Sequence, residues 1–185
     1  MTEPQSLLPI DHPWHLDRRN DLKRLLEQAT DLFGCRVEDT SFQGVVLGDR
    51  NITLSNGINV FVVLDAAAQF DLEWARFNLA HECIHFLAPS EGTNYLEEGW
   101  ASHFSLNNCF IPCERIPHYR GIIRSIDNRY YDALLNYEEF LSHRGNIKRL
   151  REEQPYISAI TKCSIRRLFP ECPEALIGKL IRRFE

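Results

Sequence analysis

The sequence predicts an α+β fold, with a mostly helical body and a small antiparallel sheet. Three short runs rich in β-branched residues lie between residues 42 and 65, whereas the stretches on either side repeat apolar residues at helical spacing. With 185 residues, 44% hydrophobic and 11% aromatic, the chain has enough apolar material for a substantial core. We therefore expect a single domain over residues 1–185.

Membrane and export signals are not evident in the sequence. No stretch approaches the ~20 consecutive apolar residues that a membrane-spanning helix needs. The opening MTEPQSLLPIDHPW carries acids and prolines and lacks the basic region of a signal peptide. We expect a cytoplasmic protein with no membrane partner.

The first half of the chain is expected to hold one helix followed by the strands. An apolar stripe predicts a helix over residues 16–33 that ends at Gly34. The runs FQGVVLG, NITL and NVFVVLD then predict two or three antiparallel strands, because Asn56-Gly57 favours a tight turn between the last two.

The rest of the chain is expected to be helical. Residues 72–88 contain no glycine or proline and predict one long helix, and a second is expected from about Tyr95 to Phe110, before Pro112. Further helices are expected at about 119–127, 130–143, 147–169 with a possible break at Pro155, and 174–184. The helical half 114–185 is basic, since residues 111–185 hold 14 Lys/Arg against 10 Asp/Glu.

The motif HECIH within the long helix carries the clearest chemical signal. His81 and His85 are four residues apart, so they lie about 40° apart on one helix face, and their ring nitrogens can converge on one ion. Glu82 is rotated by about 100° from His81, so it can act as a general base instead of a ligand. This is the HExxH arrangement of zinc metallopeptidases. The alternative is a pair of ordinary helix histidines that bind no metal.

A third ligand is expected from the second helix. Only a short turn separates the two helices, so they can pack antiparallel and bring Glu97 or Glu98 to the metal. Gly99 and Ala101 are small, which favours a close approach of the helices on that side. We expect Glu98 to be the ligand, with Glu97 as the alternative.

Two segments resemble the ImmA/IrrE-type zinc metallopeptidases. RFNLAHECIHFL, residues 76–87, is similar to the RFTLAHELGH helix of that family, and EGWASHFSLNNCFIP, residues 98–112, is similar to its E-x-x-A-N-x-F-A…L-M-P segment. The order of a helix, a short β-section and the HExxH helix is also similar, and the resemblance covers about residues 16–113. The sequence departs from the family in its shorter gap between His85 and Glu98, in Cys83-Ile84 within the motif, and in Ser102.

The resemblance implies a zinc-dependent endopeptidase. His81, His85 and Glu98 would hold one zinc ion and Glu82 would be the catalytic base. Members of the family often cleave a helix-turn-helix repressor and so relieve transcriptional repression. The CapP-like branch, which accompanies anti-phage signalling operons, is similar in being short and in lacking a DNA-binding domain of its own.

A peptidase of this kind also needs a donor for the oxyanion that forms on the substrate. His103, His118, Tyr119 and Tyr95 are candidates, and the sequence does not choose among them. Cys113 follows the helix-ending Pro112 and could fold back as an inhibitory zinc ligand, because thiolate binds zinc well. The alternative for Cys113 is a packing thiol.

The basic C-terminal half suggests a second class of function. A regulatory or nucleic-acid-sensing module with a structural or vestigial zinc site is the alternative to an enzyme, and single-stranded DNA could be an activator. The residues that could contact nucleic acid are Arg120, Arg124, Arg129, Lys148, Arg149 and Arg151.

Overall fold

The computed structural model of the chain describes residues 7–9, 12–37, 41–55, 59–89 and 92–184. Its helices and strands are α1 (Pro13–Phe33), β1 (Ser41–Gly48), β2 (Ile52–Ser55), β3 (Asn59–Asp65), α2 (Leu72–Leu87), α3 (Tyr95–Asn107), α4 (Ile116–Ile126), α5 (Asn128–Ser142), α6 (Ile147–Glu153), α7 (Lys162–Leu168) and α8 (Glu174–Leu180), with short 3-10 turns η1 (Ala66–Gln69), η2 (Cys113–Arg115) and η3 (Ile157–Ala159). The predicted class, a mostly helical α+β fold with a small sheet, is confirmed.

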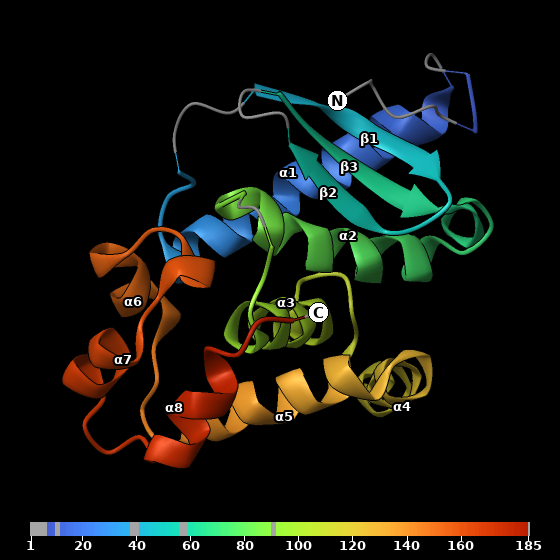
Figure 1. Cartoon of the computed structure of the whole chain (residues 1–185). Coiled ribbons are helices and arrows are strands. Elements are labelled where there is room, and N and C mark those ends of the chain that lie inside the picture. Colours follow the sequence, from blue (N-terminus) through green and yellow to red (C-terminus); the bar gives the residue numbers. More distant parts are fainter. Residues whose placement is uncertain (1–6, 10–11, 38–40, 56–58, 90–91, 185) are drawn as a thin grey trace.

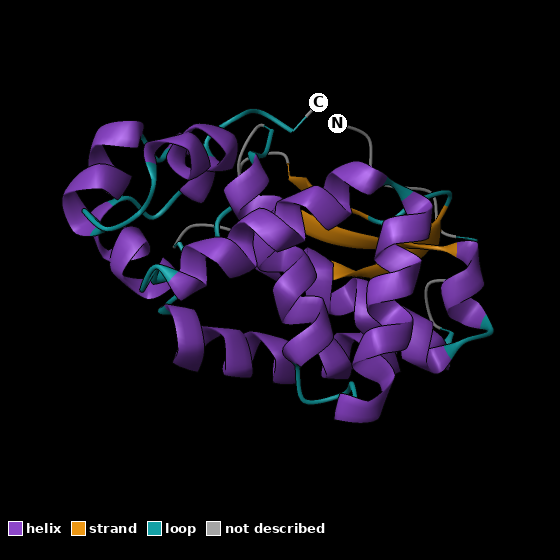
Figure 2. Cartoon of the chain, turned by 90° about the horizontal axis from the view of Figure 1, so that it is seen from below, coloured by secondary structure: helices purple, strands orange, loops and turns teal. Residues whose placement is uncertain are grey.

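The elements are stacked in layers below the sheet. Figure 1 shows the sheet at one end of the molecule, α2 beneath it, then α3, and then α5. Figure 2, viewed from below, shows helices lying in front of the sheet and a further group of helices to the left of it. None of the described helices is both long and apolar enough to cross a membrane.

The sheet is mixed, which corrects the antiparallel sheet that the sequence predicts. Its strand order is β1-β3-β2, with β2 antiparallel to β3 as expected but β1 parallel to β3. β3 takes the centre because its run VFVVL buries side chains on both faces, as a central strand requires. The short β2 is left at an edge. The predicted turn at Asn56-Gly57 lies outside the described residues.

Local sequence signals set several helix ends. Gly34 ends α1 as predicted, with φ 89° and its N–H donating to the Thr30 carbonyl. The helix predicted over 147–169 does break at Pro155, as the sequence allows, and forms α6 and α7, because the chain becomes extended at Gln154 before the proline. The helix predicted to reach Phe110 ends at Asn107, where the Asn108 side chain turns the chain by donating to the Ser105 carbonyl and accepting from the Phe110 N–H.

α2 is buried on two sides, between the sheet and α3. Side chains of α1, the sheet, α2 and α3 share one hydrophobic core, with Leu22, Val62, Leu79 and Trp100 at 0 to 1% exposed. Polar residues at the α2–α3 interface therefore sit in largely water-excluded surroundings, and the motif histidines lie there.

Gly99 serves a different contact from the one expected. A Cβ at this position would lie 2.2 Å from the Ala133 carbonyl oxygen and 2.7 Å from Cβ of Tyr137, and both residues belong to α5. Gly99 therefore allows α3 to approach α5, not α2. The sequence could not show which helix packs against Gly99, because α2 and α5 are both predicted helices that could contact α3.

Gly99→Ala should destabilise the protein. The added methyl group overlaps a backbone oxygen, so α3 and α5 must move apart, and we expect the free energy of unfolding to fall by about 3 kcal/mol. Gly121→Ala is the matched control in helix α4, where a Cβ meets nothing within 4 Å; there the free energy should rise by about 0.5–1 kcal/mol. Urea denaturation measures both, and equal stabilities of the two variants would refute the close contact.

Candidate metal centre

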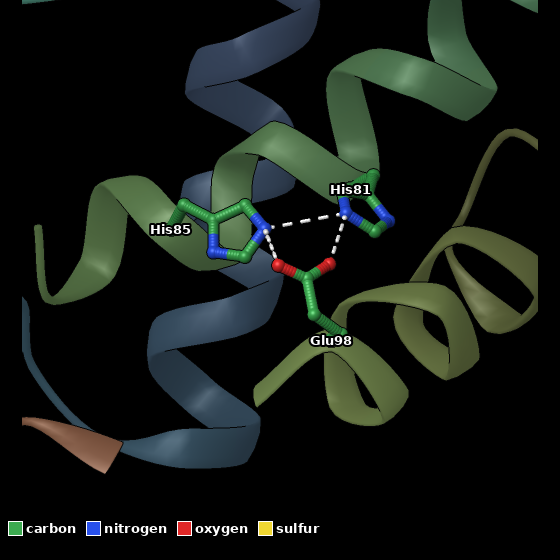
Figure 3. Close-up of side chains that lie close together, drawn as sticks. All are labelled: His81, His85 and Glu98. Atoms are coloured by element: carbon green, nitrogen blue, oxygen red, sulfur yellow. Dashed lines mark hydrogen bonds and ion pairs between the residues drawn. The ribbon is translucent and has the colours of Figure 1, made fainter. Parts of the chain in front are cut away.

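Three side chains that could hold a metal ion converge between α2 and α3. The donor atoms of His81, His85 and Glu98 all lie within 4.8 Å of one another. Nε2 of His81 lies 3.2 Å from Nε2 of His85 and 3.2 Å from Oε2 of Glu98, and Nε2 of His85 lies 3.7 Å from Oε1 of Glu98. Figure 3 shows both imidazoles extending from one helix toward the carboxylate of the next.

The helix hairpin creates this convergence. His81 and His85 project from the same face of α2 one turn apart, as their spacing predicts. The side chain of Asn94 caps α3 by accepting from the Glu97 N–H at 2.9 Å, and its amide donates to the Ile157 carbonyl at 2.9 Å. These two bonds fix the first turn of α3, where Glu98 lies, opposite the last turns of α2.

The two adjacent acids have different positions. Glu98 faces both Nε2 atoms, whereas the Oε1 atom of Glu97 lies 3.0 Å from Nδ1 of His85, on the far side of that ring. Glu97 is therefore not at the point of convergence. A carboxylate in its position fixes the ring orientation and the tautomer of a ligating histidine, which leaves Nε2 free to bind an ion.

Charge interactions within the group outweigh its burial. Burial alone would lower the pKa of His85, but the Glu98 carboxylate and the hydrogen bond with Glu97 hold that pKa well above its ordinary value. Burial would raise the pKa of Glu98, but the imidazoles of His85 and His81 hold it below its ordinary value. Glu98 is thus a carboxylate that attracts positive charge to this point. Two imidazole nitrogens and one carboxylate are the protein ligands of one class of catalytic zinc site, so the residues fit the predicted ion.

Glu82 lies beside the group without joining it. Its side chain is 4% exposed, and its Oε2 atom accepts a hydrogen bond of 2.9 Å from the Thr53 hydroxyl on β2. The same hydroxyl lies 3.1 Å from the Glu82 carbonyl. The carboxylate is therefore oriented by Thr53 of the edge strand β2, and it is not one of the three converging side chains.

Tyr130 is a site residue that sequence reasoning missed. Its ring packs edge-on against the His81 imidazole, with centroids 5.7 Å apart. Burial raises the pKa of its phenol, and the nearby carboxylates of Glu98 and Glu82 raise it further. No local signal could have identified it, because Tyr130 reaches the site only through the packing of α5 on α3.

The predicted oxyanion donors pack against rings other than those of His81 and His85. His103 is five residues beyond Glu98, so it points to another face of α3, where its ring packs against Tyr137. His118 is exposed on α4, and Tyr119 stacks on Phe77 with centroids 4.5 Å apart. Tyr95 packs against Phe184.

Cys113 is not brought to the ligand group, which corrects the expected inhibitory ligation. It is exposed in η2 and is not among the residues that converge with the two histidines. The antiparallel hairpin carries the end of α3 toward the start of α2, where Arg115 pairs with Glu73 at 2.9 Å. Glu73 is eight residues before His81, which is about 12 Å along the helix.

The predicted nucleic-acid residues are mostly engaged within the chain. Arg151 is 6% exposed, and its guanidinium donates to the carbonyls of Phe33, Gly34 and Cys35 at the end of α1, which assigns it a structural role. Two of the others form ion pairs, Arg120 with Glu138 and Arg129 with Asp127. Two lie over aromatic rings, Arg124 over Tyr131 and Arg149 over Phe169. Lys148 is exposed. Such pairing leaves less positive charge for a phosphate backbone than the sequence suggests.

Comparisons of this chain with models of known protein families, with curated proteins and with solved structures find no match. The resemblance of residues 76–87 and 98–112 to the ImmA/IrrE-type enzymes stays an expectation. The structure agrees with this expectation in one respect: the side chains of His81, His85 and Glu98 converge, and Thr53 orients Glu82, the residue next to His81.

Proposed function

We propose that this protein is a zinc-dependent endopeptidase. The observation that carries the proposal is the convergence of His81, His85 and Glu98 on one point, with Glu82 next to His81 in the chain and its carboxylate fixed by Thr53. Three protein ligands leave a coordination position open for reactants, which is the arrangement of catalytic zinc and not of structural zinc.

Each residue then has a definite role in peptide hydrolysis. A zinc ion held by Nε2 of both histidines and by the Glu98 carboxylate would supply Lewis acidity toward a water molecule and a peptide carbonyl. Glu82 takes a proton from the attacking water and returns it to the leaving amine. Thr53 keeps the Glu82 carboxylate in position.

The position of β2 supports a peptide as the substrate. β2 is an edge strand that pairs with β3 on one side, and its residue Thr53 contacts Glu82 directly. Along the described part of the chain, no strand pairs with the other edge of β2. An extended peptide can add to such an edge through main-chain hydrogen bonds, which would place a peptide bond near Glu82.

The proposed substrate is a helix-turn-helix repressor, whose cleavage would relieve repression in a stress or anti-phage response. This part of the proposal rests on the resemblance of the two helices to ImmA/IrrE-type and CapP-like enzymes. A repressor linker is extended and accessible, so it suits an edge-strand site.

The alternative, a regulatory or nucleic-acid-sensing module with a structural or vestigial zinc, has less support. A structural site has no need of a buried carboxylate such as Glu82, held by a hydrogen bond beside the ligands. The arginines that would form a basic groove include Arg120 and Arg129, which face acidic partners.

Incubation of the zinc-loaded protein with a helix-turn-helix repressor encoded next to it tests the proposal. We expect discrete fragments by mass spectrometry, no cleavage after treatment with 1,10-phenanthroline, and recovery when zinc is restored. Fully zinc-loaded protein that cleaves neither this repressor nor an unfolded protein such as casein would refute it. Salt-dependent binding of single-stranded DNA by such an inactive protein would favour the alternative.

A further inference from the structure

We infer that Tyr130 is a further catalytic residue, whose hydroxyl donates a hydrogen bond to the oxyanion that develops on the substrate carbonyl. This inference rests on the proposed peptidase function. Tyr130 would take the role for which the sequence analysis proposed His103, His118, Tyr119 and Tyr95.

The position of the ring is the first observation. Tyr130 lies in the first turn of α5, and its ring meets the His81 ring at 71° with centroids 5.7 Å apart. A phenol in contact with a ligand ring is within reach of a substrate bound at the same ligands. Of the four predicted donors, His103 packs against Tyr137, Tyr119 against Phe77 and Tyr95 against Phe184, and His118 is exposed, so none of them packs on a ligand histidine as Tyr130 does.

The chemistry of the neighbouring groups is the second observation. The carboxylate oxygens of Glu82 and Glu98 are acceptors, and Nε2 of each histidine faces the ligand cluster. Nδ1 of His85 is engaged with Glu97. A tetrahedral intermediate needs a donor aimed at its new negative charge, and the Tyr130 hydroxyl can supply one.

The C-terminal segment holds this ring in place. Phe184 packs on Tyr130 with centroids 4.7 Å apart and on Tyr95 at 5.0 Å, and its N–H donates to the Thr93 carbonyl at 3.0 Å. The Arg129 guanidinium lies 5.5 Å from the Phe184 ring centroid. Figure 1 shows this segment running from α8 across α3. A ring fixed by packing on both sides is preorganised, which is the condition for effective oxyanion stabilisation.

Tyr130→Phe tests the inference, because it removes the hydroxyl and keeps the ring. We expect kcat for peptide cleavage to fall by about 10²–10³-fold, with KM and zinc stoichiometry unchanged. Affinity for a phosphinic peptide, which mimics the tetrahedral anion, should fall by a similar factor in calorimetry. Affinity for a peptide substrate, measured in the Glu82→Gln background, should stay the same.

Tyr131→Phe is the matched control. It removes a hydroxyl from the next residue of α5, whose ring lies under Arg124, and should leave kcat and analogue affinity unchanged. Phe184→Ala should lower kcat by about 10-fold, because it releases the Tyr130 ring without removing the donor.

The outcomes separate the inference from the function on which it rests. A wild-type protein that cleaves, with Tyr130→Phe cleaving equally and binding the phosphinic peptide equally, would overturn the role of Tyr130 and leave the peptidase proposal intact. A zinc-loaded wild-type protein that neither cleaves nor binds the analogue would overturn both.

Discussion

Replacing Glu82 by glutamine should lower kcat for peptide cleavage by about 10²–10⁴-fold, the range of a general base. The fold should be retained, because the glutamine amide oxygen can still accept the hydrogen bond that Thr53 donates to Glu82. Zinc content should also be retained, because Glu82 is not one of the converging ligand residues. Steady-state kinetics with a cleavable repressor peptide and metal analysis of the same sample measure both quantities.

Glu73→Gln is the matched control for Glu82→Gln. It changes another acid of α2, but one that pairs with Arg115 at the surface, and kcat should not change. Full activity of Glu82→Gln would remove the base from the mechanism and favour the binding-module alternative. A loss of zinc in Glu82→Gln would instead place this carboxylate among the ligands.

Replacing His85 by alanine should abolish zinc binding, so that the content after dialysis falls from about one ion per chain to near zero. The remaining His81 and Glu98 form an incomplete site. Glu97→Gln should lower zinc affinity without abolishing it, because Glu97 contacts Nδ1 of His85 and not the ligand cluster. Loss of an outer carboxylate weakens metal affinity by about 10–100-fold.

Competition with a chromophoric chelator measures these affinities, and circular dichroism checks that the variants are folded. His118→Ala is the control, since this histidine is exposed on α4 and should leave zinc affinity unchanged. Wild-type stoichiometry in His85→Ala would refute the site. An equal and complete loss in Glu97→Gln and His85→Ala would make Glu97 a ligand and contradict the geometry of the two acids.

Several parts of the molecule follow from short stretches of sequence. The ends of helices depend on one or two residues, so Gly34 and Pro155 are readable where they stand. The i, i+4 spacing of His81 and His85 brings their rings together within a single helix, and no distant contact is required. The antiparallel pairing of β2 with β3 is similarly local, because consecutive strands are joined by a short connection.

Contacts between distant elements decide the remaining features. Strand order depends on which run fills the centre of the sheet, so the parallel pairing of β1 with β3 is not visible in either run alone. Gly99 is required by α5, not by α2. The basic composition of the C-terminal half overstates its free charge, because a count of residues cannot show that Arg120 faces Glu138.

The candidate site also has features that follow from local sequence and features that depend on tertiary packing. The sequence alone determines that His81, Glu82 and His85 share one helix and that an acid follows on the next, because helical periodicity acts within a few residues. Only the tertiary structure decides that Glu98 faces the imidazoles while Glu97 supports His85, that Cys113 lies near the far end of α2, and that Tyr130 adjoins His81. These positions depend on the packing of α3 against α2 and α5, and the free energy of that packing comes from side chains far apart in the chain.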